Sequence, residues 1–258
     1  MKKLFLALSL VFIITSCNNE VKKPDNDTLF QISTIDALLA GYYDGVMPLN
    51  QLIEHGNFGL GTFNKLDGEM IVYDGTVYQF KTDGKLYKAD PNNSTPFACV
   101  VNFKTSYTSA VNEGTNYADF QKLIDLTLPN DNLFYAIKVT GDFSYIKTRS
   151  VPEQEKPYIP LAEVTKNQSV FEKNNQTGTL VGFRIPSFAA GINVAGYHMH
   201  FISSDFTFGG HVLDFTAGKV TVEIMEVHNF KMTLPENSDF GKVDLTKDRS
   251  QELEKVEK

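Results

Sequence analysis

The feature that most constrains the fold of this sequence is a series of short, β-rich segments separated by tight-turn dipeptides. Residues 59–63, 69–73 and 76–80 are rich in β-branched, aromatic and other apolar residues. Asp67-Gly68 and Asp74-Gly75 lie between them, and Asp-Gly is a strong signal for a tight turn between two strands. Because such turns join antiparallel neighbours, this part of the chain is predicted to form an antiparallel β-meander.

The rest of the chain continues this pattern, with more strand than helix. Further strands are predicted at residues 97–103, 134–140, 143–148, 178–185, 196–202, 211–216 and 219–225, with the second and third paired around Gly141-Asp142. Helices are predicted at residues 35–39, 47–55 and 117–126, and residues 239–257 are predicted to form a weakly helical segment laid over the body.

These segments predict a mixed α/β (α+β) protein, a two-domain fold built on mixed, largely antiparallel β-sheets. Two prolines within residues 154–160 exclude regular structure there and place a domain boundary nearby. We therefore expect an N-terminal β-rich domain over residues 29–155 and a C-terminal domain over residues 156–258.

Composition narrows the choice of partners. The chain is 42% hydrophobic and carries a formal net charge of -7. The apolar fraction is sufficient for a sizeable core, and the net negative charge argues against nucleic acid as a partner. Cys99 lies in the apolar stretch Phe97-Ala98-Cys99-Val100-Val101, which favours a buried, inert thiol.

The N-terminal residues resemble a bacterial lipoprotein leader. Lys2 and Lys3 precede an apolar run over residues 4–14, which is too short for a transmembrane helix. The run ends in Ile14-Thr15-Ser16-Cys17, the pattern of a lipobox. We expect a signal peptide over residues 1–17, lipid on Cys17, a flexible tether over residues 18–28, and an exported protein anchored to the bacterial cell envelope. An ordinary signal peptide is the alternative.

Three of the five histidines lie within fourteen residues, at His198, His200 and His211. On a strand, residues two apart face the same side, so the first two imidazoles project together. Gly209-Gly210 is predicted to turn the chain before His211 begins the next strand. If the two strands pair, three imidazoles form a site in the C-terminal half that suits a catalytic zinc ion, or nickel, cobalt, manganese or iron.

Several motifs, in order along the chain, make the sequence similar to the α-acetolactate decarboxylase family from about residue 29 to the C-terminus. They include the following stretches: Leu60-Gly61-Thr62-Phe63, Leu66-Asp67-Gly68-Glu69-Met70, Thr95-Pro96-Phe97-Ala98, Lys147-Thr148-Arg149-Ser150-Val151, Gln154-Glu155-Lys156-Pro157-Tyr158, Gly196-Tyr197-His198-Met199-His200-Phe201 and Gly209-Gly210-His211-Val212. The resemblance implies a zinc-dependent enzyme, commonly a dimer, that converts 2-acetolactate to acetoin and carbon dioxide through a zinc-chelated enediolate.

The same resemblance implies roles for individual residues. The three histidines correspond to the family's metal ligands. Its active-site glutamate and arginine correspond to Glu69 and Arg149, and its pocket threonine corresponds to Thr62, which is expected to bind substrate. Its C-terminal glutamate, which closes on the site, corresponds best to Glu257, with Glu254 as the alternative because the spacing is shifted by about a residue. Glu69 or Glu257 is expected to protonate the enediolate.

Two alternatives remain open at this stage. A metal-dependent enzyme that acts on another small 2-hydroxy-3-keto acid would carry the same residues. A lipid-anchored protein that keeps the fold and binds a small molecule without catalysis is the second alternative, because an acetoin-forming enzyme is normally expected in the cytoplasm with its substrate.

Overall fold

The computed structural model describes residues 27–257, so the predicted signal peptide and Cys17 lie outside the described residues. The described strands are β1 (Thr28–Ile32), β2 (Met47–Pro48), β3 (Phe58–Thr62), β4 (Glu69–Tyr73), β5 (Thr76–Phe80), β6 (Leu86–Lys88), β7 (Ser94–Thr95), β8 (Ala98–Val101), β9 (Tyr107–Ser109), β10 (Phe134–Ser150), β11 (Ser169–Ile185), β12 (Gly196–Ser203), β13 (Gly209–Val227) and β14 (Asn229–Thr233). The helices are α1 (Ile35–Leu39), α2 (Leu49–Leu52), α3 (Tyr117–Asp125), α4 (Leu161–Val164) and α5 (Ser250–Glu257), with short 3-10 turns η1 (Asn64–Leu66), η2 (Thr165–Asn167), η3 (Ser187–Ala189) and η4 (Phe240–Lys242).

The first large sheet has seven strands in the order β14-β1-β8-β3-β4-β5-β6. Its pairs are antiparallel except for β1 and β14, which run parallel. The predicted meander is its β3-β4-β5 part, and Asp74 and Gly75 form the tight turn with φ values of 49° and 72°. The prediction of a hairpin at this dipeptide is therefore confirmed.

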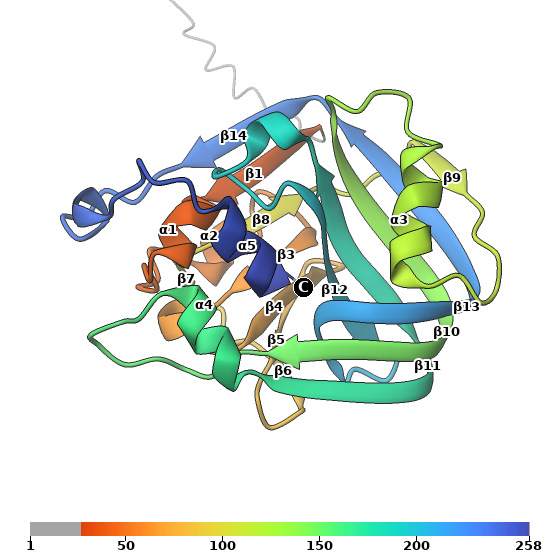
Figure 1. Cartoon of the computed structure of the whole chain (residues 1–258), viewed down its shortest axis with the longest axis horizontal. Helices are drawn as coiled ribbons and strands as arrows, with labels where there is room; N and C mark the ends of the chain where they lie inside the picture. The colour runs from red at the N-terminus through yellow and green to blue at the C-terminus, as the bar shows by residue number, and fades with distance from the viewer. Residues whose placement is uncertain (1–26, 258) are drawn as a thin grey trace, which may run out of the picture.

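The second sheet has the order β10-β11-β12-β13-β9, and β13 also pairs with β10. This additional pairing closes β10 to β13 into a ring (Figure 1). The first residues of β13 pair with β12 and the rest pair with β10, and His211 takes part in both pairings. The closure places β10 and β12 on opposite sides of His211, the predicted metal ligand on β13.

Two predicted turns in this sheet are wrong. Residues 134–140 and 143–148 are not a hairpin around Gly141 but one continuous strand, β10, and residues 211–216 and 219–225 are likewise one strand, β13. A Cβ atom on Gly141 would lie 2.2 Å from the Lys219 carbonyl oxygen, at a point where the register of β10 and β13 shifts. Glycine here permits a close approach at a β-bulge that bends the strand.

Two smaller expectations also differ. The helix predicted over residues 47–55 is limited to α2, because β2 occupies Met47–Pro48 and the helix begins only after the proline. Gly209 and Gly210 do not form the turn before His211 but are already part of β13. That turn is made by the residues after Ser203, where the Asp205 carboxylate accepts hydrogen bonds from the Ser203 and Thr207 hydroxyls.

Helices α1 and α3 form as predicted, and each is capped by a side chain. The Asn116 side chain accepts a hydrogen bond from the Asp119 backbone N–H at the start of α3. The Thr34 side chain accepts one from the Ala37 backbone N–H at the start of α1. Phe120 and Ile124, four residues apart on α3, are both fully buried against the second sheet. Helix α3 therefore covers the outer part of that sheet (Figure 1).

The two sheets pack face to face through one apolar cluster that contains residues from both. From the first sheet it includes Leu60 and Ile71, and from the second Val181 and Ile202. Cys99 belongs to this cluster and is 1% exposed, and burial raises the pKa of its thiol to about 12. The prediction that this thiol is buried is confirmed, and the raised pKa favours an inert thiol.

The helices α1, α4 and α5 meet in a separate apolar cluster at the edge of the two sheets (Figure 1). Val256 of α5 is 2% exposed and packs there with Leu161 and Val164 of α4. This cluster holds the C-terminal helix, predicted as a segment laid over the body, against the end of the strands that carry the histidines.

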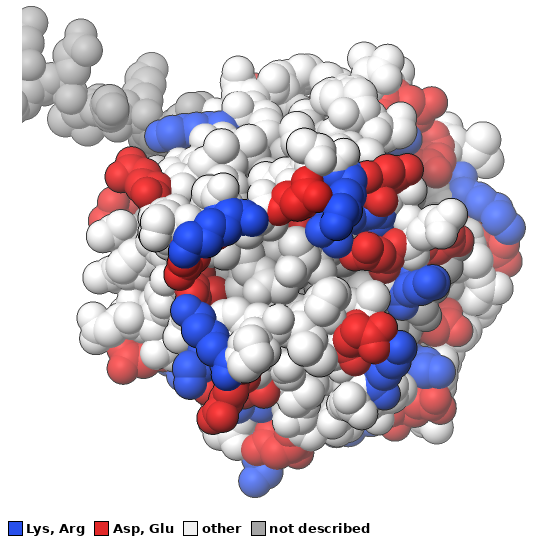
Figure 2. All heavy atoms as spheres, turned by 60° about the vertical axis from the view of Figure 1, so that its left-hand side comes forward, with Lys and Arg blue, Asp and Glu red and all other residues white. Residues whose placement is uncertain are grey.

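The predicted mixed α+β class with largely antiparallel sheets is confirmed. The boundary near residue 155 stays a prediction, and each large sheet contains strands from both sides of that position, such as β14 in the first and β10 in the second. Within residues 27–257, no helix has both the length and the apolar character needed to cross a membrane. Basic and acidic side chains are interspersed on the face shown in Figure 2.

Candidate active site

The three predicted histidines meet in a buried cluster. His198 and His200 share one face of β12, whereas Met199 and Phe201 face the apolar core on its other side. His211 lies opposite His200 in the β12–β13 register. The ring centroids are 5.0 to 5.3 Å apart, and the residues are 7%, 1% and 2% exposed. The predicted strand pairing and convergence of the imidazoles are therefore confirmed.

The donor atoms of this cluster fit a metal ion. One nitrogen of each ring lies within 4.8 Å of the other two, and each imidazole has one buried ring nitrogen without a hydrogen-bond partner in the protein. The His200 Nδ1 lies 2.8 Å from the Met70 carbonyl oxygen, which can only accept, so Nδ1 carries the proton and Nε2 is left as a lone-pair donor. Three histidine ligands are one of the sets that hold catalytic zinc in proteins.

Burial also keeps the histidines in the form that binds metal. Removal from water lowers the pKa of each imidazole below its ordinary value, and the pKa of His200 falls to about 3. The nearby Arg149 guanidinium contributes to the decrease in each case. The rings are thus neutral at physiological pH, with no proton competing for the metal-binding lone pair.

Glu69 and Arg149 form a buried ion pair beside the histidines. The Arg149 Nη1 donates to Glu69 Oε1 at 2.7 Å, and the two side chains are 5% and 6% exposed. The other carboxylate oxygen of Glu69 lies 3.7 Å from His200 Nε2. Burial raises the pKa of Glu69, and the guanidinium opposes this increase. The pair joins the two sheets, because Glu69 begins β4 and Arg149 lies near the end of β10.

The C-terminal helix adds a second carboxyl group. Glu257 Oε2 lies 3.6 Å from His211 Nε2, and burial raises the pKa of this carboxyl group to about 7. The Val256 carbonyl oxygen lies 3.4 Å from Arg149 Nη2, a long hydrogen bond that links α5 to the same guanidinium. Glu257, rather than Glu254, lines the cavity around the histidines.

Thr62 also lines the cavity, but its hydroxyl is engaged elsewhere. It donates to the Gly68 carbonyl oxygen at 2.8 Å, across the turn that precedes Glu69. The Thr62 carbonyl oxygen in turn accepts from the Thr95 hydroxyl. Thr62 therefore fixes the backbone that presents Glu69, and contact with substrate remains a prediction.

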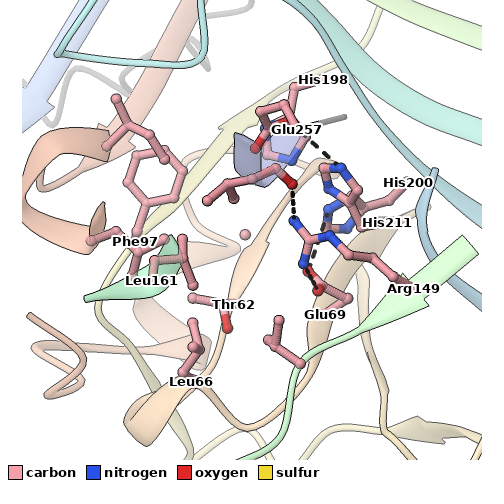
Figure 3. A pocket seen from close by; sticks show the side chains of 15 residues that line it. Thr62, Leu66, Glu69, Phe97, Arg149, Leu161, His198, His200, His211 and Glu257 are labelled. Atoms are coloured by element: carbon pink, nitrogen blue, oxygen red, sulfur yellow. Dashed lines mark hydrogen bonds and ion pairs between the residues drawn. The ribbon is translucent and has the colours of Figure 1, made fainter. Parts of the chain in front are cut away.

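The opposite wall of the cavity is apolar, and sequence reasoning did not single it out. It is formed by Ile35, Leu38, Leu66, Phe97, Val151, Leu161 and Val256. Figure 3 shows Leu66, Phe97 and Leu161 across the cavity from the histidines, Arg149 and the two glutamates. Leu66, Phe97 and Val151 lie in motifs that carried the family resemblance. No role was assigned to them, because apolar residues that line a cavity have the same sequence signal as those that fill a core.

The fold and the site together define a class. This is a mixed α+β protein, built on packed antiparallel sheets, with a buried three-histidine metal-binding group next to acidic and guanidinium side chains. That combination is typical of the active site of a metal-dependent enzyme.

Comparison with known proteins gives the family. The family model for α-acetolactate decarboxylase matches residues 29–247. An α-acetolactate decarboxylase from Methanosarcina mazei is 48% identical over 93% of this chain and 83% of its own length, and one from Methylococcus capsulatus is 44% identical over 90% of each chain. The crystal structure of α-acetolactate decarboxylase from Bacillus subtilis strain 168 superposes with a TM-score of 0.87 at 40% identity, over 89% of this chain and 99% of that one. The chain belongs to the α-acetolactate decarboxylase family, which confirms the family and the enzyme class predicted from its motifs.

Proposed function

We propose that this protein uses zinc to convert (2S)-2-hydroxy-2-methyl-3-oxobutanoate, 2-acetolactate, to (R)-acetoin and carbon dioxide. The observation that carries the proposal is the buried group of three histidines with Arg149, Glu69 and Glu257 around one cavity. Membership of the decarboxylase family supports the reaction, and three neutral imidazoles suit zinc, although other divalent metals accept the same ligands.

His198, His200 and His211 would hold the metal. When bound there, it supplies positive charge that stabilises negative charge developing on nearby oxygen atoms. The enclosing protein excludes water, which strengthens every electrostatic interaction in the cavity. The Met70 carbonyl oxygen fixes the orientation of the His200 ring through its hydrogen bond to Nδ1.

Arg149 would bind the substrate carboxylate and orient the bond that breaks. Its Nη1 is held by Glu69, whereas Nη2 has only the long contact with the Val256 carbonyl oxygen. A carboxylate that replaces this contact gains a charge-assisted hydrogen bond. Binding of this kind contributes mainly by positioning, because too strong a hold on the carboxylate would stabilise the ground state.

Loss of carbon dioxide leaves the bonding electron pair on the former ketone, which gives an enediolate. A carboxylic acid then donates a proton to one face of the carbon that lost carbon dioxide, and this makes the product chiral. Glu69 and Glu257 are the candidates, because both lie within 4 Å of a histidine of the site. The apolar wall suits the two methyl groups of the substrate.

The test is acetoin formation from racemic 2-acetolactate by the full chain, with and without a chelator. We expect turnover that the chelator abolishes and added zinc restores, with half of the racemate consumed rapidly. The matched control is His228→Ala, because His228 is an exposed histidine outside the cavity. Folded, zinc-loaded protein that forms no acetoin would contradict the proposal and would favour another 2-hydroxy-3-keto acid or a binding role.

Lipid attachment, export to the cell envelope and dimerisation are further parts of the proposal, and they rest on the lipobox sequence and on the family. Metabolic labelling with a fatty acid should label the wild-type chain and not Cys17→Ser. Light scattering of purified protein should give twice the mass of one chain. Absence of label or a monomer mass would remove the corresponding part without affecting the proposed reaction.

A further inference from the structure

The cavity around the histidines is too small for the substrate as the structure stands. Its volume is about 30 Å³, which is room for about two water molecules. The histidines and Glu69 are at most 7% exposed, whereas the Glu257 side chain is 15% exposed. Substrate must therefore enter past a side chain that moves.

A much larger groove lies next to the histidine cavity, and the two spaces share one lining residue. The groove has a volume of about 1050 Å³ and runs between α3, the segment that leads into β12, and α5. Glu257 is the one described residue that lines both this groove and the histidine cavity. The two spaces are thus neighbours, and the Glu257 side chain stands between them.

The last turn of α5 contacts the site through Val256 and Glu257. The Val256 side chain packs in the apolar cluster of α1 and α4, and its carbonyl oxygen makes the 3.4 Å contact with Arg149 Nη2. Glu257 has one carboxylate oxygen 3.6 Å from His211 Nε2. The proposed binding of the substrate carboxylate to this guanidinium would compete for the same Nη2. Arrival of substrate would therefore replace one of the contacts that keep this turn closed.

The groove wall leaves room for a small molecule to pass. Several lining residues are small, namely Ala118, Ala190, Gly191, Ala195 and Gly196. Two guanidinium groups also line it, those of Arg184 and Arg249, whose side chains are 13% and 9% exposed. Arg184 is paired with Asp125 and Asp131, and Arg249 with Glu252. Further acidic residues line the groove, so a passing anion meets groups of both signs and is not held tightly.

We propose that 2-acetolactate reaches the three histidines through the groove between α3 and α5, and that displacement of Glu257 on the last turn of α5 admits it. This inference rests on the proposed function for the identity of the substrate. The route itself also applies to a chelator that removes metal from the site, and it can be tested through metal loss alone.

The experiment introduces one cysteine at a time into the groove and then obstructs the groove by attaching a bulky group to the new thiol. Ala118→Cys on α3 and Ala195→Cys on the facing wall are made separately in the full chain with Cys17→Ser. The remaining thiol, Cys99, is 1% exposed, so we expect the maleimide not to reach it. Leu123→Cys is the matched control, because Leu123 is an exposed residue of the same helix that does not line the groove. Each protein is measured before and after reaction with a bulky maleimide, so that each serves as its own folding control.

Two rates are compared, kcat/KM for 2-acetolactate and the rate constant for zinc removal by a chelator. We expect modification at 118 or 195 to lower both by about tenfold, since hindered access slows association, and modification at 123 to change neither. Unchanged rates at both groove positions would overturn the route. If the protein has no decarboxylase activity, the proposed function fails, but slower zinc loss in the two groove variants would still support the route.

Discussion

The ion pair between Glu69 and Arg149 should respond differently to removal of each partner. Both side chains are about 95% buried, and the charged atoms are 2.7 Å apart. A guanidinium cannot release its proton in a protein, whereas a carboxyl group can take one up. In metal-free protein we therefore expect Glu69→Gln and Arg149→Met to lower the free energy of unfolding by different amounts, with a different dependence on pH.

Breaking a buried pair by removing one partner costs about 3–5 kcal/mol. Glu69→Gln leaves the Arg149 charge unpaired, but the Glu257 carboxyl group remains within electrostatic range of it. We expect the lower end, about 3 kcal/mol. The cost should decrease as the pH rises through about 7, because ionised Glu257 then partly compensates the guanidinium. Arg149→Met leaves a Glu69 carboxyl group whose pKa is raised by burial and no longer lowered by the guanidinium. At low pH, where this group is protonated, only a buried hydrogen bond is lost, at about 1–3 kcal/mol.

The cost of Arg149→Met should increase with pH. The pKa of Glu69 is already raised by burial in the native protein, and loss of the guanidinium, which opposes the increase, raises it further. At pH values between the pKa of Glu69 in the unfolded chain and its higher pKa in the folded protein, the folded state binds more protons than the unfolded state. The free energy of unfolding therefore falls as the pH rises. The slope can reach about 1.4 kcal/mol per pH unit.

The assay is urea unfolding of chelator-treated wild type and both variants, followed by circular dichroism at several pH values from 5 to 8. The quantity compared is the difference in free energy of unfolding from wild type at each pH. Lys65→Ala, which breaks an exposed pair with Glu153, is the control and should cost about 0–1 kcal/mol. A cost of Arg149→Met that does not increase with pH would refute the reasoning.

Three further predictions concern the site and the core. His200→Ala should lose bound metal and turnover, whereas His228→Ala should keep both. Elemental analysis and an acetoin assay measure the two properties, and activity in metal-free His200→Ala protein would contradict the assignment of the metal site. Glu257→Gln should lower kcat without lowering the melting temperature, and should yield racemic acetoin by chiral chromatography if Glu257 donates the proton. The same change at Glu254 should leave product chirality intact, and the opposite pattern would reassign the donor. Phe143→Ala should cost about 3–5 kcal/mol in urea unfolding, because this fully buried ring contacts two other aromatic rings; a cost below about 1 kcal/mol would mean that the core refills the space.

The metal group could be predicted from the sequence because its geometry is almost local. Two histidines at strand spacing must share a face, and the third is eleven residues further along a strand that pairs back through a short loop. The position of Glu69 and Arg149 beside them could not be derived in this way. They are 80 residues apart and belong to different sheets, so only the resemblance to a family indicated that they meet.

The continuous strands β10 and β13 were missed for a related reason. Gly141-Asp142 and Ala217-Gly218 have the composition of turns, and in isolation each favours a chain reversal. In the folded protein both glycines lie where β10 and β13 cross closely, and a Cβ atom on Gly218 would lie 2.9 Å from the Asp142 carbonyl oxygen. The close contact between two long strands decides the conformation, and such a long-range contact leaves no local signal.

The location of the site explains why its parts are spread so widely in the sequence. The histidines and Arg149 come from the curled second sheet, Glu69 and the Met70 carbonyl come from β4 of the first sheet, and Glu257 comes from α5. A shift of one sheet against the other would separate His200 from the Met70 carbonyl and Arg149 from Glu69 at once. The apolar cluster between the sheets therefore determines the tautomer of a metal ligand and the direction of the guanidinium, as well as stability. For the same reason, the C-terminal helix is the one part of the site that can move without disturbing the rest, because α5 belongs to neither sheet.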